Sequence, residues 1–87
     1  MSTLDVEQVR GTSLSFTDDS LVCELADGRT ITVPLAYYPR LLHATPEQRN
    51  DFRWIGRGSG IHWPQIDEDL SVRGFLFGWK APDNNVR

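Results

Sequence analysis

The stretch SLVCELADGRTITV, residues 20–33, predicts the centre of the fold. Its apolar residues alternate with polar ones, as happens when every second side chain of a strand faces a core. The inward set is Leu21, Cys23, Leu25, Ile31 and Val33. Asp27-Gly28 between the two halves predicts a two-residue type I′ turn, because both of its central positions need positive φ. We therefore expect a β-hairpin with one apolar face.

A third strand precedes this hairpin. Residues 13–17, SLSFT, alternate in the same way and place Leu14 and Phe16 on one face. Pro34 ends the last strand, since proline has no N–H for a ladder. The three segments predict an antiparallel three-stranded meander, and residues 4–9 are a candidate edge strand.

Two short helices are predicted after the meander. Residues 35–37 form a turn, and residues 38–44 form a helix with its proline in the first turn. The sequence TPEQ then begins a second helix over residues 46–51. Thr45 is its N-cap, and Gln48 completes a capping box.

The last part of the chain is predicted to hold a short extended pair and a C-terminal helix. The segments FRWIG (52–56) and IHW (61–63) are extended, and LSVRGFLFG (70–78) is helical with Gly78 as a left-handed C-cap. The buried stripe of that helix is Val72, Phe75 and Leu76. The predicted fold class is α+β: one domain over residues 1–78, followed by a polar tail over residues 79–87.

Composition narrows the class of protein. A chain of 87 residues suits one domain, and its net charge of −3 disfavours a nucleic-acid surface built from clustered Lys and Arg. Cys23 is the single cysteine, so neither an internal disulfide nor a cysteine zinc cluster is expected. The N-terminus lacks the pattern of a signal peptide, and no apolar run is long enough to cross a membrane. We expect a cytoplasmic protein.

The densest polar stretch is GSGIHWPQIDEDLSVRG, residues 58–74. His62 followed by acidic residues 67–69 raises the possibility of a metal site, but Pro64 interrupts the spacing that helical ligands need. Acids just before a helix can instead cap its free N–H groups, a role that suits Asp69 or Ser71. We assign no catalytic, cofactor-binding or metal-binding residue.

Two further chemistries fit the sequence poorly. The glycines of GRGSG are followed by IHWP, which cannot open the helix that a phosphate loop needs, so they predict a tight turn. Cys23 alternates in phase with Leu21 and Leu25, which indicates a core residue and not a reactive thiolate.

Aromatic residues are more numerous than one thin core layer can hide, and arginines lie among them. This composition is typical of protein-binding surfaces. The candidate partner-binding residues are Tyr37, Tyr38, Arg40, His62, Trp63, Asp67, Glu68 and Asp69. The acids among them favour a basic partner.

Several motifs resemble one known family. The DGR turn, VPLAYYPRLL, ATPEQR and GIHWPQIDEDLSVRGFL are similar to the bacterial family known as domain of unknown function (DUF) 2442, over about residues 9–78. The resemblance implies a compact α+β domain, with no catalytic residue to carry over. It also implies an antitoxin-like role beside a second small protein encoded nearby. Some relatives carry an additional C-terminal helix-turn-helix, which we expect this chain to lack.

Three functions follow as hypotheses. The first is a non-enzymatic interaction module that binds a small protein partner. The second is an enzyme or metal-dependent hydrolase that uses His62 with Asp67 or Asp69. The third is a DNA-associated regulator, which the charge disfavours. Homo-oligomerisation through exposed aromatic side chains or an edge strand is also open.

Overall fold

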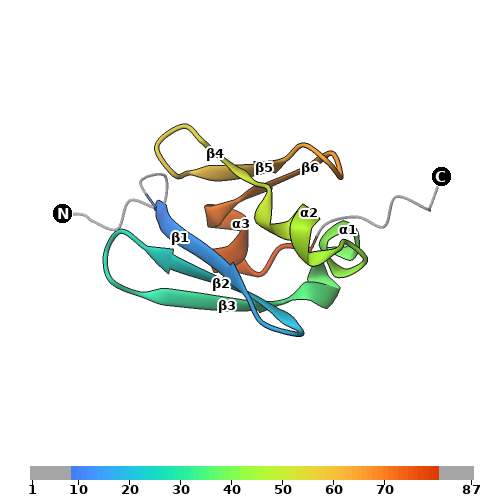
Figure 1. The fold of residues 1–87 in the computed structure, drawn as a ribbon. Coiled ribbons are helices and arrows are strands. Elements are labelled where there is room, and N and C mark those ends of the chain that lie inside the picture. The colour runs from blue at the N-terminus through green and yellow to red at the C-terminus, as the bar shows by residue number, and fades with distance from the viewer. Residues whose placement is uncertain (1–8, 81–87) are drawn as a thin grey trace.

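The computed structural model describes residues 9–80, which form two small antiparallel sheets with short helices beside them (Figure 1). The first sheet is the meander β1 (Gly11–Phe16), β2 (Ser20–Leu25) and β3 (Thr30–Pro34), in the order β1-β2-β3. The predicted meander and the α+β class are confirmed. The candidate strand over residues 4–9 lies outside the described residues, apart from Val9, which is in no strand.

The β2–β3 connection differs from the predicted type I′ turn. Leu25 donates its N–H to the Arg29 carbonyl (2.8 Å), so the loop between them has three residues and not two. Gly28 has φ +95°, whereas Asp27 is not among the residues with positive φ. A three-residue hairpin loop needs one left-handed residue, and glycine supplies it.

The helices after the meander are short. A 3₁₀ turn, η2 (Leu35–Tyr37), precedes α1 (Pro39–Leu42), which ends two residues earlier than predicted, and α2 (Pro46–Asn50). The capping box of α2 is confirmed: Thr45 accepts from the Gln48 N–H, and Gln48 accepts from the Thr45 N–H.

The second sheet corrects the predicted extended pair. It has three strands, β4 (Arg53–Ile55), β5 (Gly60–Trp63) and β6 (Glu68–Ser71), so residues 70 and 71 belong to a strand and not to a helix. The final helix α3 (Val72–Phe77) begins directly after β6 and ends at Gly78 in the predicted left-handed conformation, φ +73°. The cause of the error is local: of the four β6 residues only Leu70 is apolar, so no alternation was visible.

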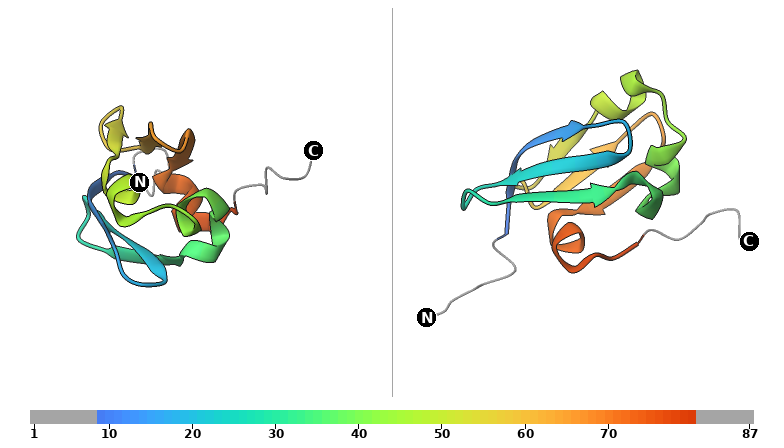
Figure 2. Two further views of the ribbon diagram at one scale, coloured as in Figure 1. Left: turned by 45° about the vertical axis from the view of Figure 1, so that its right-hand side comes forward. Right: turned by 90° about the horizontal axis from the view of Figure 1, so that it is seen from below.

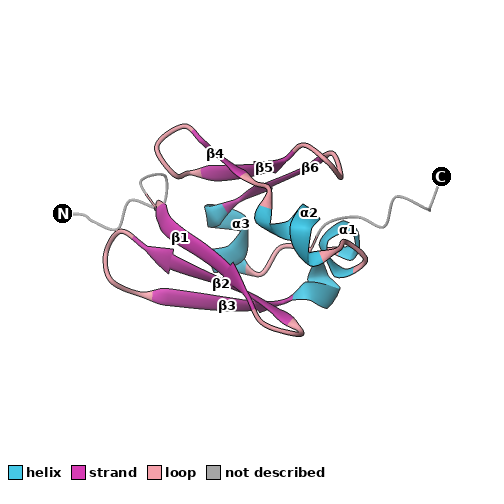
Figure 3. Cartoon of the chain, viewed as in Figure 1, coloured by secondary structure: helices cyan, strands magenta, loops and turns pink. Residues whose placement is uncertain are grey.

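Helix α3 connects the two sheets into one core. It contacts β3 of the first sheet as well as β5 and β6 of the second, and it lies between the sheets in Figure 3 and in the left view of Figure 2. The buried apolar residues come from both sheets and from the helices. They are Leu14, Leu21, Cys23, Leu25, Val33, Leu35, Tyr38, Leu41, Ile61, Trp63, Val72 and Phe75. Leu76, predicted on the buried stripe, is only half-buried, and Gly74 takes the buried place beside Phe75.

The two sheets come into direct contact where two glycines meet. Gly11 of β1 donates its N–H to the carbonyl of Gly58 in the β4–β5 turn (2.8 Å). A Cβ atom on Gly58 would lie 2.5 Å from the Gly11 oxygen, and one on Gly11 would lie 2.7 Å from the Trp54 ring. The absence of both side chains therefore permits this join.

Within residues 9–80, no helix is both long and apolar enough to cross a membrane.

Candidate functional site

His62 and Asp69 form a pair on the outer face of the second sheet. They are direct partners in the register of β5 and β6, and His62 Nδ1 lies 2.5 Å from Asp69 Oδ1. Both side chains are open to solvent, 38% exposed for His62 and 69% for Asp69. An exposed pair of this kind contributes roughly 0–1 kcal/mol to stability, so the pair orients two side chains and adds little to the fold.

The acids do not cap the last helix. Residue 67 lies in the β5–β6 turn with φ +54°, Glu68 and Asp69 lie in β6, and the first turn of α3 contains no acidic residue. Ser71 performs the capping, because its Oγ accepts from the Gly74 N–H (2.8 Å). Of the two predicted capping residues, Ser71 is confirmed and Asp69 is wrong.

Replacing Ser71 by alanine is expected to lower the free energy of unfolding by about 1 kcal/mol, the usual effect of losing an N-cap. Urea unfolding of the two proteins measures this change. Ser13→Ala is the matched control, because Ser13 is an exposed strand serine, and its loss should change stability by less than about 0.5 kcal/mol. Equal effects of the two substitutions would contradict the assignment of the cap.

Arg40 fastens the tip of the β5–β6 hairpin. Its Nη1 donates to the carbonyls of Ile66 (3.2 Å) and Asp67. The guanidinium thus bonds to the backbone of the turn. Arg40 therefore holds the acidic tip in position, and its predicted contact with a partner stays a prediction.

Glu68 is partly buried, whereas Asp67 and Asp69 are exposed. Burial raises the pKa of its carboxyl above the ordinary value, the Asp69 N–H and Arg40 oppose the rise, and the charges of Asp69 and Asp67 add to it. The ionised carboxylate is therefore less stable in the folded chain than in the unfolded one.

The raised pKa has a consequence for stability. The stabilising contribution of protonated Glu68 is complete below the ordinary glutamate pKa, and it is lost as the pH rises through the raised one. Glu68→Gln cannot ionise and keeps an oxygen for the Asp69 N–H. We expect the stability of the variant relative to the parent to increase between about pH 4 and pH 7, measured by urea unfolding at several pH values. A difference that stays constant over this range would contradict the prediction.

Two predicted contact residues lie in the core. Tyr38 is 1% exposed and Trp63 is 0% exposed, so neither can reach a partner, and the prediction is corrected for both. The Trp63 indole N–H donates to the Arg49 carbonyl (2.9 Å), while the Tyr38 hydroxyl is buried with no hydrogen-bond partner among the described residues. Each of these two rings follows a polar or aromatic residue in the sequence. The local pattern therefore did not indicate that the rings are buried.

Cys23 is a core residue, as predicted. Burial, with a smaller effect of Glu24, raises the pKa of its thiol to about 11. The thiol therefore stays protonated at neutral pH, and a protonated thiol is a poor nucleophile. Among residues 9–80, no three His, Cys, Asp or Glu side chains gather in an arrangement that could hold a metal ion.

An exposed aromatic pair at the end of α3 was missed by the sequence reasoning. Phe77 and Trp79 are 51% and 55% exposed, and their rings stack with centroids 5.6 Å apart and an interplanar angle of 25°. We call this pair the aromatic platform. The motif FGW could have indicated this pair. A glycine C-cap turns the chain back along its own helix, which brings the residue after the glycine beside the end of the helix.

The backbone holds the platform in place. Gly78 turns the chain, and Trp79 then donates its N–H to the Gly74 carbonyl (3.0 Å). A Cβ on Gly74 would lie 3.4 Å from the Trp79 ring, so the indole rests directly on the helix.

Two cations flank the platform. The Arg73 guanidinium carbon lies 5.9 Å from the centre of the Trp79 ring, and Lys80 Nζ lies 4.9 Å from the centre of the Tyr37 ring. Tyr37, a predicted contact residue, thus lies beside this surface and is half-buried.

A hollow of about 190 Å³ lies beside Trp79 of the platform and reaches β6. It is lined by residues of β6, by α3, by the residues after α3 and by Tyr38, which precedes α1. The lining is Tyr38, Asp69, Leu70, Ser71, Gly74, Phe75, Trp79 and Lys80. Asp69 and Lys80 therefore both border this depression, and the Asp69 carboxylate is at the same time bonded to His62 on the outer face of the sheet.

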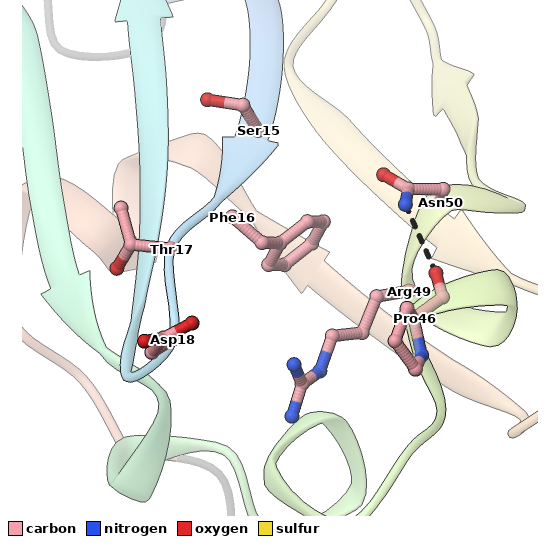
Figure 4. Close-up of a pocket in the computed structure, with 7 residues that line it drawn as sticks. All are labelled: Ser15, Phe16, Thr17, Asp18, Pro46, Arg49 and Asn50. Carbon is pink, nitrogen blue, oxygen red and sulfur yellow. Dashed lines mark hydrogen bonds between the residues drawn. The ribbon is translucent and has the colours of Figure 1, made fainter.

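A larger groove of about 420 Å³ lies between the β1–β2 turn and α2 (Figure 4). Phe16 points across it toward Pro46 and Arg49. Arg49 donates to the carbonyls of Leu41 (2.8 Å) and Leu42 (2.9 Å), which are acceptors at the end of α1. None of the predicted site residues lines this groove.

The fold and this surface define an α+β domain of two three-stranded sheets with a solvent-exposed aromatic pair. The family model described as "Protein of unknown function (DUF2442)" matches residues 12–81, and the chain belongs to this family. No curated protein matches the chain.

Two solved structures share the fold. A protein of unknown function from Rhodospirillum rubrum has a TM-score of 0.74 at 24% identity, over 88% of this chain and 95% of the other. The uncharacterised protein CV0863 from Chromobacterium violaceum has a TM-score of 0.70 at 23% identity, over 86% of this chain and 71% of the other. At these identities the likeness concerns the fold alone.

Proposed function

We propose that the chain is a non-enzymatic protein-interaction domain, and that its partner is a small protein encoded by a neighbouring gene. The observation that carries the proposal is the aromatic platform, held by backbone contacts and left half exposed. Large apolar rings fixed in solvent are typical of contact surfaces, because a partner gains their burial without having to order them.

The chemistry of the surface agrees with this class. Aromatic residues and arginine dominate the energetics of interfaces, and Arg73 lies against Trp79. The resemblance to the DUF2442 family supports the small neighbouring partner and the antitoxin-like role. The contact surface consists of the platform, with Tyr37, Arg73 and Lys80 beside it and the hollow that Asp69 also borders.

Co-expression of the chain with the neighbouring gene product tests the proposal. We expect the pair to elute together in size-exclusion chromatography. The double variant F77S/W79S should release the partner, whereas L42S/I55S should retain it, because Leu42 and Ile55 are similarly exposed (40% and 44%) on other elements. Separate elution of the parent pair, or retention by both variants, would contradict the proposal.

The other two hypotheses predict different results. A hydrolase would show bound metal or turnover that is lost in His62→Ala, although His62 here pairs only with an exposed carboxylate. A DNA regulator would shift operator DNA in a salt-dependent way. Either result would replace the interaction proposal.

A further inference from the structure

Strand β6 lies at an edge of the second sheet, where β5 is its only neighbouring strand among the described residues. The ladder decides which main-chain groups of β6 face β5. Val72, directly after β6, donates its N–H to the Ser59 carbonyl (2.9 Å), and the bonded residues of an antiparallel pair alternate along each strand. The N–H and C=O groups of Asp69 and Ser71 therefore point away from β5.

Two of these four groups already have partners inside the chain. The Asp69 N–H donates to Oε1 of Glu68 (3.2 Å). Ser71 is the N-cap of α3, and the carbonyl of an N-cap residue accepts the first bond of its helix. The Asp69 carbonyl and the Ser71 N–H remain, and within residues 9–80 neither has a hydrogen bond outside the ladder from which both point away.

The remaining acceptor and donor have the spacing that a parallel strand requires. In a parallel pair, a single residue donates to the carbonyl of one residue and accepts from the N–H two positions later. An antiparallel strand would instead need both groups of the same residue, and one group of Asp69 and one of Ser71 are already bonded.

The hollow beside this edge offers apolar surface to an extended chain. It borders residues 69–71, and Phe75 and Trp79 are in its lining. Tyr38 also lines it, and the Tyr38 hydroxyl is the one buried side-chain N or O atom of residues 9–80 without a hydrogen-bond partner. Unused hydrogen-bonding groups and apolar side chains therefore occur together here.

We infer that the partner protein adds an extended segment to the edge of β6, parallel to this strand, and that one residue of the segment bonds to both the Asp69 carbonyl and the Ser71 N–H. Strand addition gains affinity from main-chain hydrogen bonds and specificity from side-chain pockets. Arg40 holds the turn before β6, so the edge loses little freedom on binding. The inference rests on the proposed function and names the element that the partner contributes.

Hydrogen exchange, measured by NMR on the chain alone and in complex with the neighbouring gene product, tests the inference. The Ser71 amide should exchange at least about tenfold more slowly in the complex, because a new hydrogen bond protects it. The Thr32 amide is the matched control. It also points away from the neighbouring strand, on the edge strand β3, because the Leu25 N–H bonds to the Arg29 carbonyl and the ladder alternates from there. An unchanged Ser71 amide, or equal slowing of both amides, overturns the inference.

A charge in the hollow provides a second test. Leu70→Lys should raise the dissociation constant of the complex at least about tenfold, because the segment would bury an unpaired ammonium group. Ile31→Lys changes a residue that is also half-buried, on β3, and should alter this constant less than about twofold. Circular dichroism checks that both variants are folded, and the exchange measurement on the parent chain decides if one is not. A folded Leu70→Lys chain that binds like the parent overturns the inference.

The two proposals fail in different ways. A complex that forms without protection of the Ser71 amide overturns the added strand and leaves the proposed function standing. Absence of any complex with the neighbouring gene product contradicts the proposed function, and the inference then fails with it.

Discussion

Replacing Trp63 by alanine is expected to lower the free energy of unfolding by about 3–5 kcal/mol, the range for removing a large buried aromatic side chain. Trp63 is fully buried, and its ring packs near Phe52 with centroids 6.3 Å apart. Its indole N–H also donates to the Arg49 carbonyl, so the substitution removes a hydrogen bond that fastens α2 to β5. A small domain has a total free energy of unfolding of only about 5–15 kcal/mol, so this substitution removes a large part of it.

Trp79→Ala is the matched control. The same atoms are removed, but the Trp79 side chain is 55% exposed and lies outside the core. Urea unfolding followed by circular dichroism should show a small loss for Trp79→Ala and a large loss for Trp63→Ala. Similar losses would mean that Trp63 does not occupy the core position assigned to it.

Gly58→Ala is the second substitution with a large expected effect. Gly58 has φ +96°, which costs an L-residue about 1–2 kcal/mol. A Cβ would in addition meet the Gly11 oxygen at 2.5 Å, which forces the two sheets apart and adds about 1–3 kcal/mol of overpacking. We expect the free energy of unfolding to fall by the sum of both effects.

Gly28→Ala separates these two effects. Gly28 has nearly the same φ, +95°, but nothing lies within 4 Å of its Cβ position. The control therefore has the backbone cost alone, and the difference between the two variants in urea unfolding measures the close approach of the sheets. Equal losses in the free energy of unfolding would show that Gly58 is not in close contact with β1.

The parts of the fold that the sequence predicted are those with local causes. The alternation of Leu21, Cys23 and Leu25 fixes one face of β2 against a core, and the Thr45–Gln48 box fixes the start of α2. Gly78 ends α3 as expected, because its left-handed conformation costs glycine little. Each of these signals needs only a few neighbouring residues.

The errors come from residues whose surroundings are distant in sequence. Strand β6 is formed by pairing with β5, although its own residues are mostly polar. Asp69 was predicted to cap a helix and pairs instead with His62, seven residues away and opposite it in the ladder. The candidate site was predicted in part: the acidic tip and Tyr37 lie at the surface, whereas Tyr38 and Trp63 do not.

By itself the sequence determined the meander, the capping box of α2 and the glycine that ends α3, because periodicity and backbone preference act over a few residues. Only the tertiary structure decided which aromatic rings are buried. That choice depends on where α3 lies relative to both sheets, and burial is a property of the whole packed chain. The same packing leaves Phe77 and Trp79 in solvent beside cations and acids, which is the arrangement on which the proposed binding surface depends.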